Sequence, residues 1–261
     1  MNEELINKIH FGDCLNVMDS IIDGSINLIL CDLPYGTTQN KWDSIIDLEH
    51  LWRHYKRILH PLGTIVLTAA QPFTSILVMS NIKMFKYEWV WKKTDSTNFL
   101  NAKHQPLRIH ESVLVFYNKN KYNPQGLKHF NKFVKNAPGI NTPNYGAVKG
   151  NQYKQSFTNY PESVLNFDSA NNTIHSTQKP VDLFRYLIRT YTDIGELVLD
   201  NCIGSGTTGL AALTEGRNFI GIENDEDNFK KGTKRLHNFK INESTKIFTV
   251  AQINTEQIKL L

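Results

Sequence analysis

The sequence predicts an α/β protein with a mostly parallel sheet covered by helices on both faces. Continuous apolar runs such as Ile26–Cys31 are typical of strands that are buried on both faces. Segments with the apolar spacing of helices alternate with these runs, which is the pattern of a parallel sheet. The length of 261 residues fits one large domain, or one domain that carries a substantial insertion.

Composition excludes several other classes of protein. Hydrophobic residues make up 40% and charged residues 21%, which is ordinary globular usage and not that of a disordered chain. No apolar run approaches the ~20 residues that span a bilayer, and the N-terminus lacks the apolar core of a secretory signal. The three cysteines, Cys14, Cys31 and Cys202, form no CxxC pair. We therefore expect a cytoplasmic protein without a membrane partner, a disulfide framework or a metal site.

Residue patterns predict the elements in chain order. The expected strands of the first half are Lys8–Phe11, Ile26–Cys31, Thr64–Ala69, Tyr87–Trp91 and Ser112–Tyr117. Its expected helices are Ser44–Leu59 and Pro72–Ser80, and the polar stretch Lys92–His110 is interpreted as a loop. In the second half, helices are expected at Val181–Tyr191, Gly206–Gly216 and Asp225–Asn238, and strands at Glu196–Leu199, Asn218–Ile222 and Lys246–Val250.

A stretch without acidic residues separates the two α/β blocks. From Ser112 to Pro161 there is no Asp or Glu, and aromatic residues are interleaved with lysines. The lysines are Lys119, Lys121, Lys128, Lys132, Lys135, Lys149 and Lys154. Cationic side chains bind phosphates and aromatic rings stack on bases, so this pattern is typical of a nucleic-acid-binding surface. The structural alternative is a solvated, loop-rich insertion that is basic by chance.

A glycine-rich turn follows the strand Glu196–Leu199. Gly204, Gly206 and Gly209 form a GxGxxG pattern between a strand and a helix, and Glu223 ends the next strand. This context is typical of nucleotide sites, because the turn admits a ligand close to the backbone and the acid suits a ribose diol. Asp200 would repel a pyrophosphate but suits an ammonium group, which favours S-adenosylmethionine over a dinucleotide. A purely structural turn is the alternative.

The second candidate site is Asp32-Leu33-Pro34-Tyr35, directly after the apolar run Ile26–Cys31. Open α/β sheets bind ligands outside the carboxyl ends of their strands, so we expect Asp32 in the same crevice as the glycine turn. Pro34 stiffens the loop and leaves the Leu33 carbonyl free to accept a hydrogen bond. Asp32 and this carbonyl could hold a planar exocyclic amine beside the Tyr35 ring. An Asp-initiated turn closed by Pro and Gly is the alternative.

Together these motifs resemble those of the β-group of S-adenosylmethionine-dependent DNA amino-methyltransferases. Asp32–Tyr35 is similar to the (D/N/S)PPY motif, and Asp200–Gly206 is similar to the FxGxG cofactor motif. His175–Pro180 resembles the HPTQKP element, and Arg108–Glu111 is also similar to a segment of the family. The order of the motifs, catalytic before cofactor, is that of the β-group. The sequence departs from the family pattern at Leu33, where the motif usually has its first proline.

The resemblance implies a permuted Rossmann-like methyltransferase fold with a mostly parallel, seven-stranded sheet. It divides the chain into a catalytic half at 1–117, a target-recognition insertion at 118–172 and a cofactor-binding half at 173–261. It also implies methyl transfer to N6 of adenine in double-stranded DNA, with the base flipped out of the duplex. N4 of cytosine is the alternative acceptor. A nicotinamide-dependent oxidoreductase and a non-catalytic nucleic-acid-binding module are the alternative functions.

The resemblance also assigns roles to single residues. The implied catalytic residues are Asp32, Leu33, Pro34 and Tyr35. The implied cofactor-binding residues are Asp13, Lys179, Asp200, Gly204, Ser205, Gly206, Thr207 and Glu223, with Asp13 at the adenine of the cofactor and Lys179 at its carboxylate. Trp42 and Asp43 are candidates for holding the flipped base, and the seven lysines are expected to bind DNA. A second copy of the chain and a cognate restriction endonuclease are further candidate partners.

Overall fold

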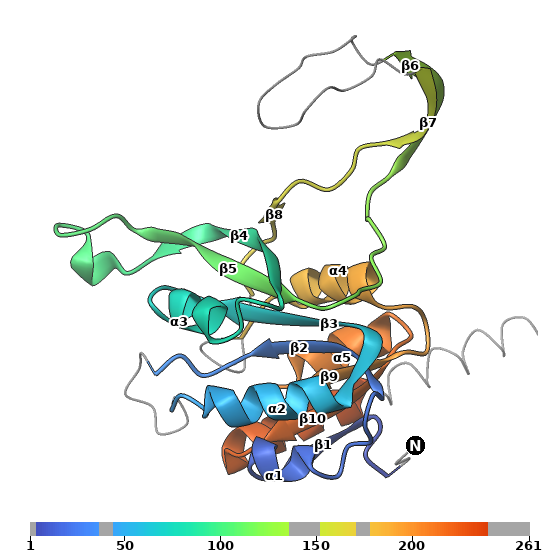
Figure 1. The fold of residues 1–261 in the computed structure, drawn as a ribbon. Helices are drawn as coiled ribbons and strands as arrows, with labels where there is room; N and C mark the ends of the chain where they lie inside the picture. The colour runs from blue at the N-terminus through green and yellow to red at the C-terminus, as the bar shows by residue number, and fades with distance from the viewer. Residues whose placement is uncertain (1–3, 37–43, 136–151, 171–177, 240–261) are drawn as a thin grey trace, which may run out of the picture. The chain divides into compact units, whose positions relative to one another are not determined.

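The computed structural model describes residues 4–36, 44–135, 152–170 and 178–239. It contains two compact units, which are described separately. We call Met1–Asn123 with Ser163–Leu261 the body, and Pro124–Glu162 the inserted unit. The described part of the body contains an eight-stranded sheet in the order β1-β10-β9-β2-β3-β5-β4-β8 (Figure 1).

The sheet is mostly parallel, as the sequence predicts. Among the described strands of this sheet, only β5 runs antiparallel to its neighbours β3 and β4, and all other neighbouring strands are parallel. The strands are β1 (Lys8–Phe11), β2 (Ile26–Asp32), β3 (Leu59–Ala69), β4 (Phe85–Thr97), β5 (Arg108–Phe116), β8 (Val164–Asn166), β9 (Leu197–Asp200) and β10 (Asn218–Glu223).

Helices cover both faces of this sheet. Side chains alternate along β2, so that Ile29 and Cys31 belong to one buried cluster while Leu28 and Leu30 belong to the other. The first cluster includes residues of α1 (Cys14–Met18), α2 (Leu48–Ile58) and α3 (Phe73–Ser80). The second includes residues of α4 (Val181–Tyr191), α5 (Thr207–Thr214) and the helix at 226–239. Among the described residues, no helix is long and apolar enough to cross a membrane.

The structure corrects two expectations about the sheet. It has eight strands and not seven, because the three-residue strand β8, with one buried side chain, pairs with the edge of β4. The polar segment Lys92–His110 is largely not a loop, since β4 continues to Thr97 and β5 begins at Arg108, with the short 3₁₀ helix η1 (Phe99–Asn101) between them. Cross-strand pairing holds these polar residues in strands despite their low apolar content. The expected strand Lys246–Val250 lies outside the described residues.

The inserted unit contains a two-stranded antiparallel sheet of β6 (Lys128–Lys135) and β7 (Gln152–Thr158). The His129 and Phe157 rings lie 4.9 Å apart across the two strands, and the Asn159 side chain donates to the Gly126 carbonyl. A two-stranded sheet is only marginally stable on its own. The unit, Pro124–Glu162, spans fewer residues than the predicted insertion 118–172, and its role in target recognition stays a prediction.

Candidate active site

Acidic residues gather where neighbouring parallel strands end. Asp32 ends β2, Asp200 ends β9 and Glu223 ends β10, while Asp13 follows β1 by two residues. Because parallel strands place their carboxyl ends at one edge of the sheet, these four acids lie along that edge. A cavity of about 760 Å³ opens there, and Asp13, Asp32 and Glu223 line it. This volume is in the range of small-molecule sites.

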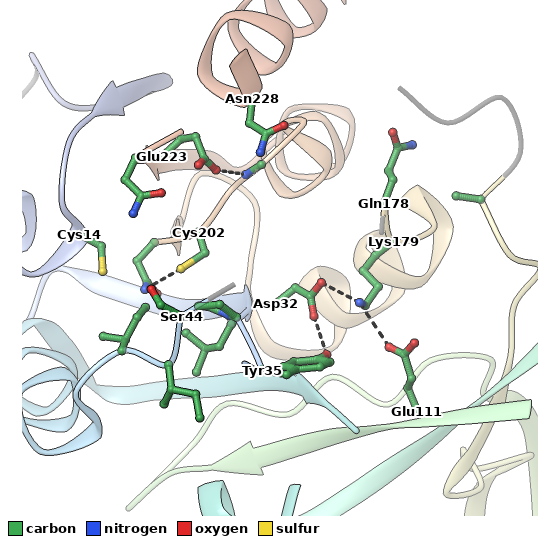
Figure 2. A pocket seen from close by; sticks show the side chains of 18 of the residues that line it. Cys14, Asp32, Tyr35, Ser44, Glu111, Gln178, Lys179, Cys202, Glu223 and Asn228 are labelled. Atoms are coloured by element: carbon green, nitrogen blue, oxygen red, sulfur yellow. Dashed lines mark hydrogen bonds and ion pairs between the residues drawn. The ribbon is translucent and has the colours of Figure 1, made fainter. Parts of the chain in front are cut away.

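The cavity has two ends of different chemistry (Figure 2). Glu223 and Asn228 lie at one end, whereas Asp32, Tyr35, Lys179 and Glu111 lie at the other. The first end is held by the turn after β9 and the helix at 226–239, and the second by β2, β5 and the segment before α4. The sequence therefore brings the two predicted motifs into one cavity.

Both carboxylate oxygens of Asp32 accept hydrogen bonds. The Tyr35 hydroxyl donates to Oδ1 over 2.6 Å, and the Thr68 hydroxyl donates to the same atom. The Lys179 ammonium donates to Oδ2, also over 2.6 Å. The Asp32 side chain is nevertheless 25% exposed, so it is held firmly and still faces the cavity.

Lys179 belongs to a chain of alternating charges that the sequence did not predict. Its ammonium pairs with Asp32 and lies 3.3 Å from Glu111 Oε2, and the other oxygen of Glu111 pairs with Lys93. Burial acts to lower the pKa of Lys179, but the two carboxylates more than offset it and raise this pKa. Burial acts to raise the pKa of Glu111, but Lys179 and Lys93 more than offset it and lower this pKa. Both side chains are therefore charged at neutral pH.

Tyr35 is a donor that stays protonated. Burial, followed by the nearby charge of Asp32, raises the pKa of its phenol well above the ordinary value. Its ring stacks on Phe73 with centroids 5.3 Å apart, and the Lys179 ammonium lies 5.8 Å from the ring centroid. Leu33 is buried and lines the cavity together with Pro34. All four residues of the Asp32–Tyr35 motif therefore border the cavity.

The glycine turn after β9 is tied to the end of β10. The Gly204 amide donates to Glu223 Oε2 over 2.8 Å, and the Asp225 amide donates to Oε1 over 2.9 Å. Gly204 and Gly206 have positive φ angles of 52° and 82°, a conformation that side-chain-bearing residues rarely adopt. Burial raises the pKa of Glu223. A carboxylate has about four lone-pair sites, so Glu223 can still accept from a ligand in the cavity.

Both carboxylate oxygens of Asp200 accept hydrogen bonds from the protein. The Cys202 amide donates to Oδ1 over 3.0 Å, and the Thr208 hydroxyl, in the first turn of α5, donates to Oδ2. Asp200 is 3% exposed and does not line the large cavity; burial raises its pKa to about 7. It borders a smaller cavity of about 50 Å³ with Ser205, Thr207 and Lys179. Each oxygen keeps a further lone pair, as in Glu223, so the expected role of Asp200 at the cofactor ammonium stays a prediction.

The remaining predicted cofactor residues are placed as follows. Asp13 lines the large cavity and also caps α1, where its Oδ1 accepts from the Leu15 and Asn16 amides. Lys179, expected at the cofactor carboxylate, lines the large cavity and donates to Asp32. Gly206 begins α5 and lines neither of the two cavities. Ser205 and Thr207 border the smaller one alone.

The predicted DNA-binding lysines fall into three groups. Lys128, Lys132 and Lys154 belong to the inserted unit and are exposed, as is Lys119 of the body. Lys121 lies in the body, where its ammonium pairs with Asp193 and Glu196 at 2.5 and 2.6 Å. The side chain of Lys135, together with Lys149, Trp42, Asp43 and His175, lies outside what the structure describes.

Sequence reasoning missed several residues that line the cavity. They are Trp91, Lys93, Glu111, Asn201, Cys202, Asn224 and Asn228, among others. The signal for Glu111 was present, because the Arg108–Glu111 segment resembles a family element. No comparable motif indicates Lys93, because the sequence of 92–110 is interpreted as a loop.

The cysteines are free thiols in the described structure. Burial raises the pKa of Cys31, next to Asp32, to about 12, so it remains a thiol at neutral pH. Among the described residues, no group of three His, Cys, Asp or Glu side chains could hold a metal ion.

Comparison with known sequences identifies relatives over most of the chain. The chain is 28% identical to the Type II methyltransferase M.HinfI of Haemophilus influenzae, over 92% of this chain and 70% of that protein. It is also 28% identical to the DNA adenine methyltransferase YhdJ of Escherichia coli K12, over 86% of this chain and 81% of that one.

Solved structures of methyltransferases share the fold. The M1.HpyAVI-SAM complex superposes with a TM-score of 0.59 and 24% identity, over 87% of this chain and 98% of that chain. The cytosine-N4-specific PvuII DNA methyltransferase gives a TM-score of 0.63 and 16% identity, over 86% of this chain and 84% of that chain. The fold is thus the Rossmann-like fold of methyltransferases. A family model described as DNA methylase, of N6 and N4 type, matches residues 26–234, and the chain therefore belongs to the DNA methylase family.

Proposed function

We propose that this DNA methylase transfers a methyl group from S-adenosylmethionine to the exocyclic N6 amine of adenine at a specific DNA sequence. The observation that carries the proposal is the environment of Asp32. This carboxylate ends β2, faces the 760 Å³ cavity and is fixed by three donors, with the Leu33-Pro34-Tyr35 segment beside it. A fixed carboxylate in a cavity can orient an amine that donates to it.

The exocyclic amine of adenine is a poor nucleophile, because its lone pair is delocalised into the ring. Hydrogen bonds from this amine to Asp32 and to the Leu33 carbonyl would favour a more tetrahedral nitrogen with a localised lone pair. Asp32 is held by Tyr35 and Thr68, so the acceptor does not need to reorganise when the amine arrives. The chain's contribution is thus positioning and electrostatic preorganisation, and the target base must leave the duplex to reach it.

The other end of the cavity fits the methyl donor. Glu223 keeps lone pairs for a ribose diol, and Asp13, Gly204, Asn224 and Asn228 border the same space. S-adenosylmethionine, when bound there, supplies an electrophilic methyl group. We assign its nucleoside part to the Glu223 end, because the methyl group must face Asp32 at the opposite end. The roles of Asp200 at the cofactor ammonium and of Lys179 at the cofactor carboxylate stay predictions.

Adenine is proposed over cytosine because the motif begins with aspartate. The resemblance associates Asp at this position with N6 of adenine, and the relative YhdJ is named a DNA adenine methyltransferase. The family also contains N4 methylases, and the PvuII enzyme is cytosine-N4-specific. Recognition of the target sequence by the inserted unit, a homodimer and a cognate restriction endonuclease stay predictions.

The experiment uses DNA that was amplified in vitro and therefore carries no methyl groups. The chain is incubated with this DNA and labelled S-adenosylmethionine, and the DNA is digested to nucleosides for mass spectrometry. We expect N6-methyladenine, and we expect no product when S-adenosylhomocysteine replaces the donor. N4-methylcytosine alone would overturn the choice of base, and the absence of any methylated base would overturn the proposed activity. Methylation-sensitive sequencing of the product then gives the target sequence.

A further inference from the structure

Two carboxylates at the active site share one ammonium group (Figure 2). Lys179 Nζ lies 2.6 Å from Asp32 Oδ2 and 3.3 Å from Glu111 Oε2. Glu111 Oε2 is fully buried and accepts no hydrogen bond from the described residues, while Lys93 pairs with the other oxygen. Lys179 therefore donates a hydrogen bond to Asp32 and lies within ion-pair distance of a second carboxylate oxygen, which accepts no hydrogen bond from the described residues.

The position of Lys179 restricts the acceptor capacity that the proposed function requires of Asp32. Of the roughly four lone-pair sites of the Asp32 carboxylate, three are already taken, by Tyr35, Thr68 and Lys179. Hydrogen bonds from charged donors are stronger than those from neutral ones. The neutral amine of a target base thus competes with an ammonium group for Oδ2 of Asp32.

We propose that Lys179 is an exchangeable donor, which holds Asp32 before the target base enters and moves to Glu111 Oε2 when the amine takes its place. This inference rests on the proposed function. Lysine has a flexible four-carbon stem, so a short displacement of the ammonium is feasible. The exchange keeps Lys179 paired with a carboxylate throughout, which avoids leaving a buried charge without a partner. Glu111 acts through Lys179 as a positioning residue, and Lys93 holds Glu111 in place.

The test measures kcat and KM for labelled methyl transfer to DNA amplified in vitro, with the wild-type chain and three variants. Glu111→Gln leaves Asp32 as the anionic partner of Lys179. The Lys179 ammonium then binds Asp32 more tightly, and the amine of the target base must displace it. We expect kcat/KM for DNA to fall roughly ten-fold or more, the usual effect of one hydrogen bond to a charged group. Lys179→Met in the Glu111→Gln background removes the competitor, and we expect the double variant to be several-fold more active than Glu111→Gln alone. Lys179→Met by itself completes the cycle.

A structural role for Glu111 would give a different pattern. If Glu111 simply supported the fold, the second substitution would lower activity further and would not restore it. Glu111→Asp keeps the charge but shortens the side chain, so it carries the test should Glu111→Gln fail to fold. Glu88→Gln makes the same change at an exposed position of β4 and should leave kcat/KM unchanged. Binding of S-adenosylhomocysteine, measured by calorimetry, should be equal in all variants.

Two results would overturn the exchange. One is a Glu111→Gln variant as active as the wild type, and the other is a double variant no more active than Glu111→Gln. A wild-type chain that transfers no methyl group to DNA would contradict the proposed function instead, and the two failures are therefore distinguishable.

Discussion

The body and the inserted unit use charged side chains in different ways. In the body, charges at the cavity are buried and paired: Asp32 pairs with Lys179, and Glu111 pairs with Lys179 and Lys93. The inserted unit has exposed lysines with no ion-pair partner among the described residues: Lys128, Lys132 and Lys154. The same residue type therefore serves as a fixed part of a network in one unit and as a free surface charge in the other.

This difference determines how substitutions should act. Removing one member of a buried charge pair leaves its partner unpaired, so single changes in the body should have large, non-additive effects. Exposed cations contribute individually and are screened by salt, so changes in the inserted unit should be smaller and additive. The predictions that follow test each side of this contrast.

Asp32→Ala should give the largest effect. It removes the acceptor for the target amine, and we expect methyl transfer to fall by about three orders of magnitude or more, since orientation is the main contribution to rate. Binding of S-adenosylhomocysteine should remain nearly intact, because the Glu223 end of the cavity is unchanged. Labelled transfer and calorimetry measure the two quantities. Asp182→Ala, at an exposed residue of α4, is the matched control, and retained turnover in Asp32→Ala would refute the assigned role.

Replacing Lys128, Lys132 and Lys154 together by alanine should weaken DNA binding and flatten its salt dependence. Each phosphate contact contributes about 0.9 to the slope of log affinity against log salt, so the triple variant should lose roughly 2–3 from this slope. The measurement is a DNA titration at several salt concentrations. Lys121→Ala is the control from the same basic stretch, because that lysine is already paired with Asp193 and Glu196. An unchanged slope in the triple variant would rule out this surface as the DNA contact.

Thr208→Val tests a pairing inside the body that involves no cation. The hydroxyl donates to Asp200, which is buried, so its removal should lower the free energy of unfolding by about 1–3 kcal/mol. Thr214→Val is the control in the same helix, where the hydroxyl donates to the Leu210 carbonyl at the exposed surface. Urea unfolding gives both values, and equal losses in the two variants would show that the Asp200 contact is not special.

The sequence predicts well what depends on local pattern. Val181–Tyr191 is confirmed as α4, and the apolar run after Ser25 is confirmed as β2 with Asp32 at its end. Asp32 and Glu223 could be expected in one cavity, because parallel strands bring their carboxyl ends to a common edge. These features follow from periodicity and from the geometry of a parallel sheet.

What the sequence does not predict depends on register between distant segments. Glu111 faces the cavity because β5 pairs with β4 in a register that sets Trp91 opposite Glu111. Lys179 reaches Asp32 across 147 positions of the chain. The segments of Glu111 and Lys179 both resemble family elements, but nothing in the local sequence indicates that these two side chains meet at Asp32. The fold class could therefore be derived from the sequence, whereas the charge network at the site could not.

Asp200→Asn should give an effect that is visible as a change of stability with pH. Burial raises the pKa of Asp200 to about 7, whereas an unfolded aspartate has a pKa of about 4. The folded state therefore binds this proton more tightly than the unfolded state. The contribution of Asp200 to the free energy of unfolding is fully present below about pH 4 and is lost as pH rises through about 7. Asparagine cannot titrate, so the stability of the wild type relative to Asp200→Asn should fall as pH rises across this window.

Asp193→Asn provides a control of opposite sign for this measurement. The hydrogen bond from Lys121 lowers the pKa of Asp193, so the stability from this exposed residue is present above about pH 4 and is lost as pH falls. Urea unfolding at several pH values should therefore give slopes of opposite sign for the two variants. The same sign of slope for both would contradict a raised pKa for Asp200 and would show that its carboxylate is charged in the folded state.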